Sequence, residues 1–329
     1  MLVVRALKKP PTGRRRKPSY LWDRTLESRS SEVREFRSTE TVWGRACRKY
    51  SATHSPRGRD SPGGPLLRSS TSALLHFCTP ELLELLELLS YDLVQQMHPF
   101  VGTSGYQYTA WRGVFYPEKM PTAKMLSYYA EQFSTTEINY TFHRIPNPKT
   151  IENWFVSTPE SFQFGLKAPQ KITHWSKLRD AETLNYFLGV VSDLRPKLGP
   201  ILFQLPPTLK MDRTLLADFL ANFPKNFQAA FEFRHQTWFV DEIFSLLQEH
   251  NVAVCIAESS EFAAPQVVTA NHGYLRLRRE DYVDADIQRW ADYVGSQMDR
   301  WNTVFVYFKH EESGIGPRLA KQFIQAIEA

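Results

Sequence analysis

Two glutamates are the side chains best suited to acid–base chemistry in this 329-residue chain. Glu137 lies in the run TTEINYT and Glu232 in the run FEFRH. A carboxylate whose pKa is tuned by a neighbouring charge can transfer protons, so both are predicted catalytic residues. The alternative is a structural role, in which Glu232 pairs with Arg234 or Lys167.

Other short sequence runs of the same kind contain positively charged side chains. Lys167 ends the run FQFGLK; it could hold an anion or, as a desolvated amine, act as a catalytic nucleophile. Anion binding is the favoured role. Arg234, Arg276 and Lys309 add three more positive side chains, and such a cluster would suit phosphate, sulfate or carboxylate.

Aromatic residues near these runs could provide flat surfaces for a sugar or a base. The candidates are Tyr106, Trp111, Tyr140 and Trp238. Ordinary packing in the core or at its rim explains them equally well.

The histidines suggest a metal site less strongly. His143, His174, His235 and His310 lie on separate runs, and no two have HExxH-like spacing. No metal ligands and no particular cofactor are therefore predicted.

The elements that would position these residues alternate between short β-rich runs and longer helical patterns. Eight such units favour a TIM-like (β/α)8 barrel. A doubly wound sheet is the runner-up, but GTSGYQY does not have the GxGxxG spacing of its phosphate loop. The predicted strands are Phe100–Ser104, Thr135–Thr141, Phe162–Lys167, Pro200–Leu205, Ala229–Arg234, Val252–Glu258, Gly273–Arg278 and Val304–Lys309. The predicted helices are Ala123–Gln132, Ala181–Leu194, Arg213–Asn222, Val240–His250, Ala285–Asp299 and Pro317–Ile327.

Strand alternation predicts which side chains point into the barrel. Glu137 and Asn139 share one face of their strand, and so do Glu232 and Arg234. Phe231 and Phe233 would then face the helices. Charged residues inside a barrel are costly unless they are paired or reach water, so they are expected at its mouth.

The body of the chain resembles the YecE-like proteins, a family called domain of unknown function 72. The resemblance rests on GTSGY, TTEINYTFHR, FQFGLK with ITH, LFQLPP, FEFRHQTWF and the final VYF, in that order from Phe100 to the C-terminus. It implies a TIM-like barrel whose shared polar residues gather at the C-terminal mouth, and it implies no reaction. From these segments Asn139, Arg144, His174 and Gln204 join the predicted ligand-binding residues.

The chain departs from the family pattern near its end. The family usually shows R-x-H-G in the seventh strand and Phe-Asn-Asn at the eighth, whereas this chain has YLRLRR and YFKHE. Arg276 keeps the arginine, Arg278 replaces the histidine, and Lys309 and His310 replace the asparagines. The departures weaken any transfer of activity from the family.

Composition divides the chain in two. Residues 1–96 hold 17 Lys or Arg and 10 Asp or Glu, whereas residues 97–329 hold 23 and 25, so the body carries a formal charge of −2. RRRK at 14–17 and the breaker-rich stretch at 54–65 predict a disordered extension, with a short amphipathic helix at 80–93. The alternative is that the natural start is Met97 and the extension is spurious.

No apolar run is long enough to span a bilayer and no signal-peptide core appears, so the expected location is the cytoplasm. Cys47, Cys78 and Cys255 predict neither a disulfide framework nor a zinc site, and Cys255 in VAVCIA reads as a core residue. The sequence predicts no oligomeric state.

Three functions stay open. The favoured one is an enzyme or binding protein for a small anionic or phosphorylated ligand, clamped by Lys167, Arg234 and Arg276. The second is a nucleic-acid binder or endonuclease-like protein, which the slightly acidic body disfavours. The third is a non-catalytic binding protein.

Overall fold

The structure, a computed structural model, describes residues 97–310 and 314–328. The predictions for residues 1–96, including those for Cys47 and Cys78, lie outside the described residues.

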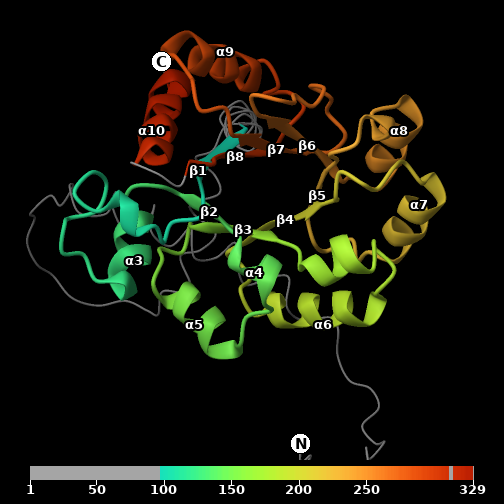
Figure 1. The fold of residues 1–329 in the computed structure, drawn as a ribbon, viewed down its shortest axis with the longest axis horizontal. Coiled ribbons are helices and arrows are strands. Elements are labelled where there is room, and N and C mark those ends of the chain that lie inside the picture. Colours follow the sequence, from blue (N-terminus) through green and yellow to red (C-terminus); the bar gives the residue numbers. More distant parts are fainter. Residues whose placement is uncertain (1–96, 311–313, 329) are drawn as a thin grey trace, which may run out of the picture. The chain divides into compact units, whose positions relative to one another are not determined.

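The eight strands close into a barrel in chain order. Every neighbouring pair is parallel, and β8 pairs with β1 to complete the ring (Figure 1). The predicted TIM-like (β/α)8 barrel is therefore confirmed. The strands are β1 (His98–Ser104), β2 (Thr135–Ile138), β3 (Gln163–Lys167), β4 (Leu198–Gln204), β5 (Ala229–Glu232), β6 (Ala253–Glu258), β7 (His272–Leu277) and β8 (Thr303–Phe308).

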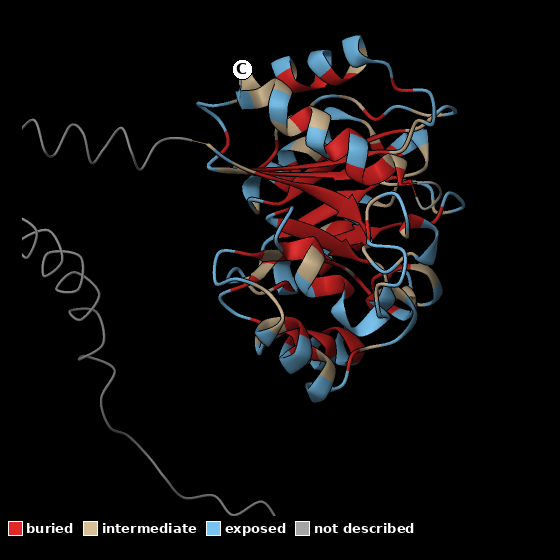
Figure 2. Ribbon diagram, turned by 90° about the vertical axis from the view of Figure 1, so that its left-hand side faces the viewer, coloured by how far each residue is buried: buried red, intermediate tan, exposed pale blue. Residues whose placement is uncertain are grey.

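Helices surround the strands and bury one apolar side each against them (Figure 2). They are α3 (Met125–Ala130), α4 (Tyr140–His143), α5 (Pro148–Val156), α6 (Ala181–Ser192), α7 (Arg213–Asn222), α8 (Asp241–Glu249), α9 (Asp284–Gly295) and α10 (Ile315–Glu328). Shorter turns of helix are η2 (Thr109–Trp111), η3 (Thr122–Lys124), η4 (Lys171–Trp175) and η5 (Gln236–Trp238). In the described part of the chain, no helix has the length and apolar character needed to cross a membrane.

Strand β5 shows how alternation sorts side chains between the two layers. The ring of Phe231 packs 5.7 Å from that of Phe219 on α7, so it faces the helices. Glu232, the next residue, is buried and points the other way, into the barrel. The predicted alternation in this strand is confirmed.

The inside of the barrel is filled rather than hollow. Phe100, Tyr274, Phe305 and Tyr307 form a separate apolar cluster there, together with Cys255, which is a core residue as predicted. Because the interior is packed, a ligand can reach the inward polar residues only from the end of the barrel.

Helices α4 and α5 were not predicted, and several predicted strands extend too far. The strand predicted to run to Thr141 ends at Ile138, and Asn139 instead precedes the one-turn helix α4. Helix α5 carries recognisable signals, because Asn147 caps it by accepting from the Thr150 N–H and Pro148 occupies its first position. The predictions that Arg234 and Lys309 lie within their strands are also wrong, since β5 and β8 end two and one residues earlier. The strands predicted to end at Leu205 and Arg278 each end one residue earlier as well.

Candidate functional site

A buried arginine between two glutamates forms the centre of the barrel's C-terminal end. Arg276 on β7 pairs through Nη2 with Glu137 Oε1 at 2.8 Å and through Nη1 with Glu232 Oε2 at 2.5 Å. All three side chains are at most 2% exposed. The three residues come from β2, β5 and β7, so the barrel brings them together from positions far apart in the sequence.

Further hydrogen bonds complete the shells of both carboxylates. Glu137 accepts from Ser104 Oγ at 2.5 Å and from Tyr274 Oη at 2.7 Å. Glu232 accepts from Gln204 Nε2 at 2.8 Å. Such complete pairing is what allows charged groups to remain buried.

The pKa of each glutamate lies below its ordinary value. Burial alone would raise the pKa of Glu137, but the charge of Arg276 and the hydrogen bonds lower it. For Glu232, burial is likewise outweighed by Arg276, Arg278 and Arg234. Both carboxylates are therefore ionised at neutral pH, and neither has the raised pKa that a general acid needs.

Two more arginines and a lysine lie nearer the solvent. Arg234 Nε is 3.1 Å and Arg278 Nη2 is 3.3 Å from Glu232 Oε1. Lys167 Nζ donates to Gln204 Oε1 at 2.9 Å and stands 4.1 Å from the ring centre of Phe142. We call the set of Lys167, Arg234, Arg276, Arg278, Glu137 and Glu232 the mouth cluster.

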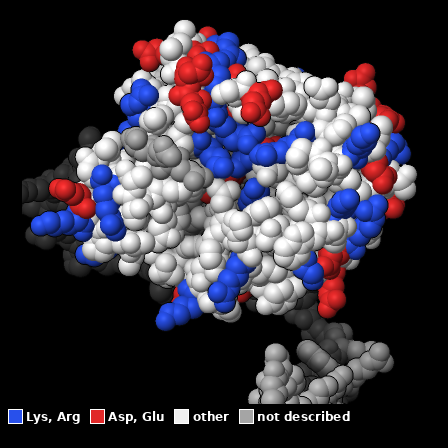
Figure 3. All heavy atoms as spheres, viewed as in Figure 1, with Lys and Arg blue, Asp and Glu red and all other residues white. Residues whose placement is uncertain are grey.

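The mouth cluster contains four cationic side chains and two carboxylates. In Figure 2 the strand arrows point toward the face that Figures 1 and 3 present to the viewer. On that face, Lys and Arg atoms gather around a hollow near its centre (Figure 3). The cluster thus has an excess of positive charge where the strands end.

Lys167 is the member of the mouth cluster that titrates nearest neutrality. Burial, followed by the charge of Arg276, lowers its pKa from 10.5 to about 8, although Glu137 and Glu232 act in the opposite direction. Burial, Lys167 and Arg234 also lower the pKa of His174, which is therefore mainly neutral at pH 7.

An unusual connection after β3 holds His174 beside the cluster. Residues Lys171–Trp175 form a π-helix, and Lys177 and Leu178 follow with φ of 48° and 68°. The His174 ring contacts Phe142 edge-on at 5.0 Å. π-Helical turns and left-handed non-glycine residues cost energy and concentrate at functional sites.

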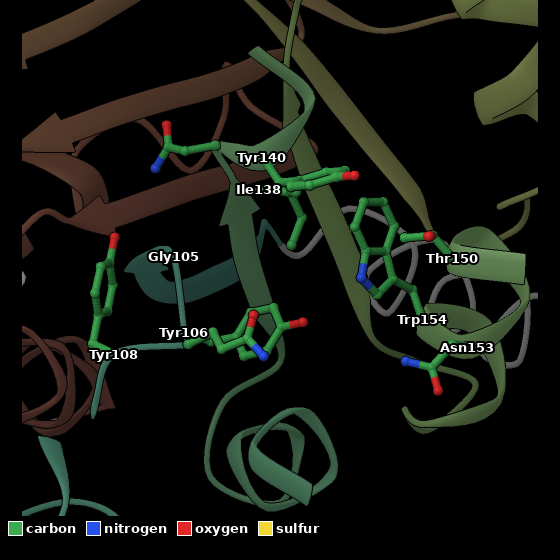
Figure 4. Close-up of a pocket in the computed structure, with 10 residues that line it drawn as sticks. Gly105, Tyr106, Tyr108, Ile138, Tyr140, Thr150, Asn153 and Trp154 are labelled. Atoms are coloured by element: carbon green, nitrogen blue, oxygen red, sulfur yellow. The ribbon is translucent and has the colours of Figure 1, made fainter. Parts of the chain in front are cut away.

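A cavity of about 410 Å³ opens next to the mouth cluster, over the ends of β1 and β2. Figure 4 shows the rings of Tyr106, Tyr140 and Trp154 around a shared space. Asn139 belongs to both regions, because it lines the cavity and also donates through Nδ2 to Ser104 Oγ at 2.8 Å.

The structure brings most of the predicted site residues into these two neighbouring regions. It assembles Glu137, Glu232, Lys167, Arg276, Arg234, Gln204, His174, Asn139 and Tyr106. Arg144 is exposed at the end of α4, and Lys309 follows β8 with its backbone N–H bonded to Leu277 O at 3.0 Å. The catalytic and ligand-binding roles given to all the residues named in this paragraph stay predictions.

Two predicted ligand-binding residues lie in the core instead. Trp111 and Trp238 are each 0% exposed. Trp111 packs on Tyr108, and Trp238 stacks on Phe233 and donates through Nε1 to Leu209 O. Neither offers a face to a ligand, so the core-packing alternative is correct for both.

Sequence reasoning missed several members of the site. Arg278 was noted only as a departure from a family pattern, yet it lies two residues after Arg276, just past the end of β7, and binds Glu232. Alternation in YLRLRR could have found it. Ser104, Tyr274 and Trp154 carry no comparable signal, because serine, tyrosine and tryptophan occur at many structural positions.

Within residues 97–310 and 314–328, no group of three or more His, Cys, Asp or Glu side chains is arranged to hold a metal ion.

Solved structures from two bacteria share the fold. A DUF72 family protein from Thermotoga maritima MSB8 superimposes with a TM-score of 0.63 at 23% identity, covering 70% of this chain and all of that one. A DUF72 family protein from Enterococcus faecalis V583 gives 0.60 at 18% identity, covering 70% and 96%.

Sequence comparison gives the same family. UPF0759 protein YunF from Bacillus subtilis (strain 168) is 22% identical over 254 residues, covering 65% of this chain and 90% of that protein. The family model described as "Protein of unknown function DUF72" matches residues 100–329, well over half of the chain. The chain therefore belongs to the DUF72 family.

Proposed function

We propose that the protein binds a small anionic or phosphorylated ligand at the mouth of the barrel. Lys167, Arg234 and Arg278 are the cations that would contact it. Arg276, which sequence reasoning included in the clamp, would act indirectly, since both of its terminal nitrogens bind glutamates.

The charge balance of the mouth cluster is the observation that carries this proposal. Two carboxylates offset two of the four cations, which leaves an excess of about two positive charges in a partly desolvated place. Like charges held together in this way are costly, and an anion would relieve the repulsion.

An unsatisfied donor adds support. Arg278 Nε is buried and finds no hydrogen-bond acceptor among the residues that the structure describes. Buried donors are nearly always paired, and an anion oxygen is an acceptor that would suit this one.

The pKa directions favour Lys167 over the glutamates for any proton transfer. Glu137 and Glu232 hold their charge far below neutral pH, so their proposed task is to fix the position of Arg276. Lys167, with a pKa of about 8, can carry a proton to or from a bound ligand. A neutral amine of this kind could equally serve as a nucleophile.

Thermal unfolding with inorganic phosphate tests the proposal. We expect phosphate to stabilise the protein, by about 2.7 kcal/mol when its concentration is a hundred times its dissociation constant. Lys167→Met and Arg234→Met should each abolish most of this effect.

Lys225→Met is the matched control, because Lys225 is an exposed lysine in the connection from α7 to β5, at the opposite end of the barrel. It should respond to phosphate like the unaltered protein. Equal stabilisation of all three variants would place the anion site elsewhere.

A further inference from the structure

The cavity beside the mouth cluster differs from it in chemistry. Its lining has four aromatic rings, from Tyr106, Tyr108, Tyr140 and Trp154, and no charged side chain. Its remaining polar groups are mainly carboxamides, from Asn139, Asn153 and Gln107. A neutral, flat group with hydrogen-bonding edges fits these walls better than a second charged group does.

The rings of the cavity are held in place before any ligand arrives. Trp154 is 4% exposed, its ring stacks on Phe164 at 6.1 Å, and it meets the ring of Tyr140 edge-on at 6.5 Å. The Tyr106 carbonyl accepts from Tyr116 Oη at 2.5 Å. Tyr140 is 46% exposed and so presents an open aromatic face.

Helix α4 connects the cavity to the mouth cluster. Tyr140, its first residue, lines the cavity, while the ring of Phe142 lies under Lys167 Nζ. Thr141 between them donates through Oγ1 to the Lys167 carbonyl at 2.6 Å. The helix has four residues and is only about 6 Å long, so the cavity and the mouth cluster are neighbours.

We propose that the cavity binds a nucleobase, and that the anionic ligand is a nucleoside monophosphate. The base would lie against Tyr140 and Tyr106 with its edge toward the carboxamides, and the phosphate would lie on Lys167, Arg234 and Arg278. Asparagine and glutamine side chains match the paired donor and acceptor of a base edge. A phosphate monoester carries a charge of about −2 at neutral pH, which equals the excess of the mouth cluster.

This inference rests on the proposed function for the position of the phosphate. Isothermal titration calorimetry distinguishes failure of the base site from failure of the anion site. The four probes are inorganic phosphate, a nucleoside 5′-monophosphate, the same nucleoside without phosphate, and ribose 5-phosphate. We expect the nucleotide to bind at least about tenfold more tightly than phosphate or ribose 5-phosphate.

Tyr140→Ala is the decisive variant, because Tyr140 is partly exposed and its removal leaves the core intact. Loss of base stacking should weaken nucleotide binding by about 5- to 100-fold and leave phosphate binding unchanged. Tyr186→Ala, at a 64% exposed tyrosine on α6 that does not line the cavity, is the control and should bind the nucleotide normally.

Three results would overturn the inference. They are equal affinity for nucleotide and phosphate, a nucleotide advantage that survives Tyr140→Ala, and ribose 5-phosphate binding as tightly as the nucleotide. If the unphosphorylated nucleoside binds and phosphate does not, the base site stands and the proposed anion site fails.

Discussion

Arg276 lowers the pKa of Lys167 and of both buried glutamates, which favours the neutral form of the lysine and the charged form of the glutamates. Burial, followed by the charge of Arg276, lowers the pKa of Lys167 to about 8, and the same charge keeps Glu137 and Glu232 ionised. Arg276 therefore stabilises the charged forms of Glu137 and Glu232 and also makes Lys167 easier to deprotonate. Perturbed groups of this kind gather at functional sites more often than elsewhere.

The lowered pKa of Lys167 gives anion binding a pH dependence. Sulfate is a useful probe because its charge does not change between pH 6 and pH 10. Protonated Lys167 attracts the anion, so binding should be strong below pH 8 and fall by up to about tenfold per pH unit above it, as the lysine loses its proton. The arginines stay charged throughout.

Calorimetric titrations at several pH values check this expectation. In Lys167→Met, the residual sulfate affinity should not vary between pH 7 and pH 9. A wild-type affinity that stays constant up to pH 10 would contradict the assigned pKa.

Removing Arg276 should destabilise the fold strongly. Arg276→Met leaves Glu137 and Glu232 buried without their main counter-charge, which costs about 3–5 kcal/mol at pH 7. The pKa of both glutamates should then rise, since burial dominates. In the unaltered protein, the pKa of each glutamate is lower in the folded state than in the unfolded state. This difference stabilises the fold at any pH above the unfolded-state pKa, and the stabilisation is lost as the pH falls through the folded-state pKa.

The loss in free energy of unfolding caused by Arg276→Met should therefore be smaller at pH 5 than at pH 7, because the glutamates of the variant can bind protons between these pH values. Urea unfolding at the two pH values measures this. Arg289→Met removes an arginine that is 47% exposed and should cost no more than about 1 kcal/mol. An equal deficit at both pH values would mean that the glutamates stay charged without Arg276.

At the scale of elements, the strands carry most of the mouth cluster, and short irregular segments rather than the long helices lie beside it. Helix α4 lies between the cavity and Lys167, and the π-helix η4 carries His174. The long helices α6, α7 and α10 cover the barrel and contribute none of the mouth cluster. This division between a rigid barrel and variable connections is the usual one for the TIM-barrel fold.

The pairing of β1 with β2 depends on a glycine. A Cβ on Gly102 would stand 2.0 Å from the carbonyl oxygen of Thr135, which is backbone and cannot move aside cheaply. Gly102→Ala should therefore destabilise the protein by about 1–3 kcal/mol or more and disturb the neighbouring Ser104 and Glu137.

Gly189→Ala is expected to stabilise the protein, in contrast to Gly102→Ala. Gly189 lies within α6 and a Cβ there meets no atom within 4 Å, so alanine should stabilise the helix by about 0.5–1 kcal/mol. Denaturant midpoints of the two variants test the contrast. No loss of stability in Gly102→Ala would mean that β1 and β2 can separate without cost.

At the scale of the whole molecule, charge is distributed unevenly along the chain. Residues 1–96 carry a formal +7, whereas residues 97–329, which include the barrel, carry −2. Any general affinity for nucleic acid is thus expected from the first segment rather than from the barrel.

A chain that begins at Met97 should separate these contributions. It retains β1, which starts at His98, and we expect it to unfold cooperatively and to keep the phosphate effect. It should bind duplex DNA no more tightly than non-specifically, while the full chain binds more tightly with a steep salt dependence between roughly 50 and 200 mM.

Fluorescence anisotropy with labelled duplex at several salt concentrations measures this, and a melting curve confirms that the shorter chain is folded. Sub-micromolar, salt-sensitive binding by the Met97 chain would instead favour the nucleic-acid function over the small-ligand one.

The sequence by itself determined the barrel, the order of its strands and the inward direction of Glu232. Those properties follow from local periodicity and from motifs read in order, and short-range patterns carry both. Helix α5 could also have been predicted from the sequence, because Asn147 and Pro148 mark its start.

Only the tertiary structure decided the partners and the exposure of the site residues. Glu137 and Arg276 are 139 residues apart, and Glu232 and Arg276 are 44 apart, so no local pattern links them. Trp111 and Trp238 differ from Tyr140 in burial, which depends on elements packed from elsewhere in the chain. Contact and solvent access are properties of the closed barrel, whereas periodicity is a property of each strand alone.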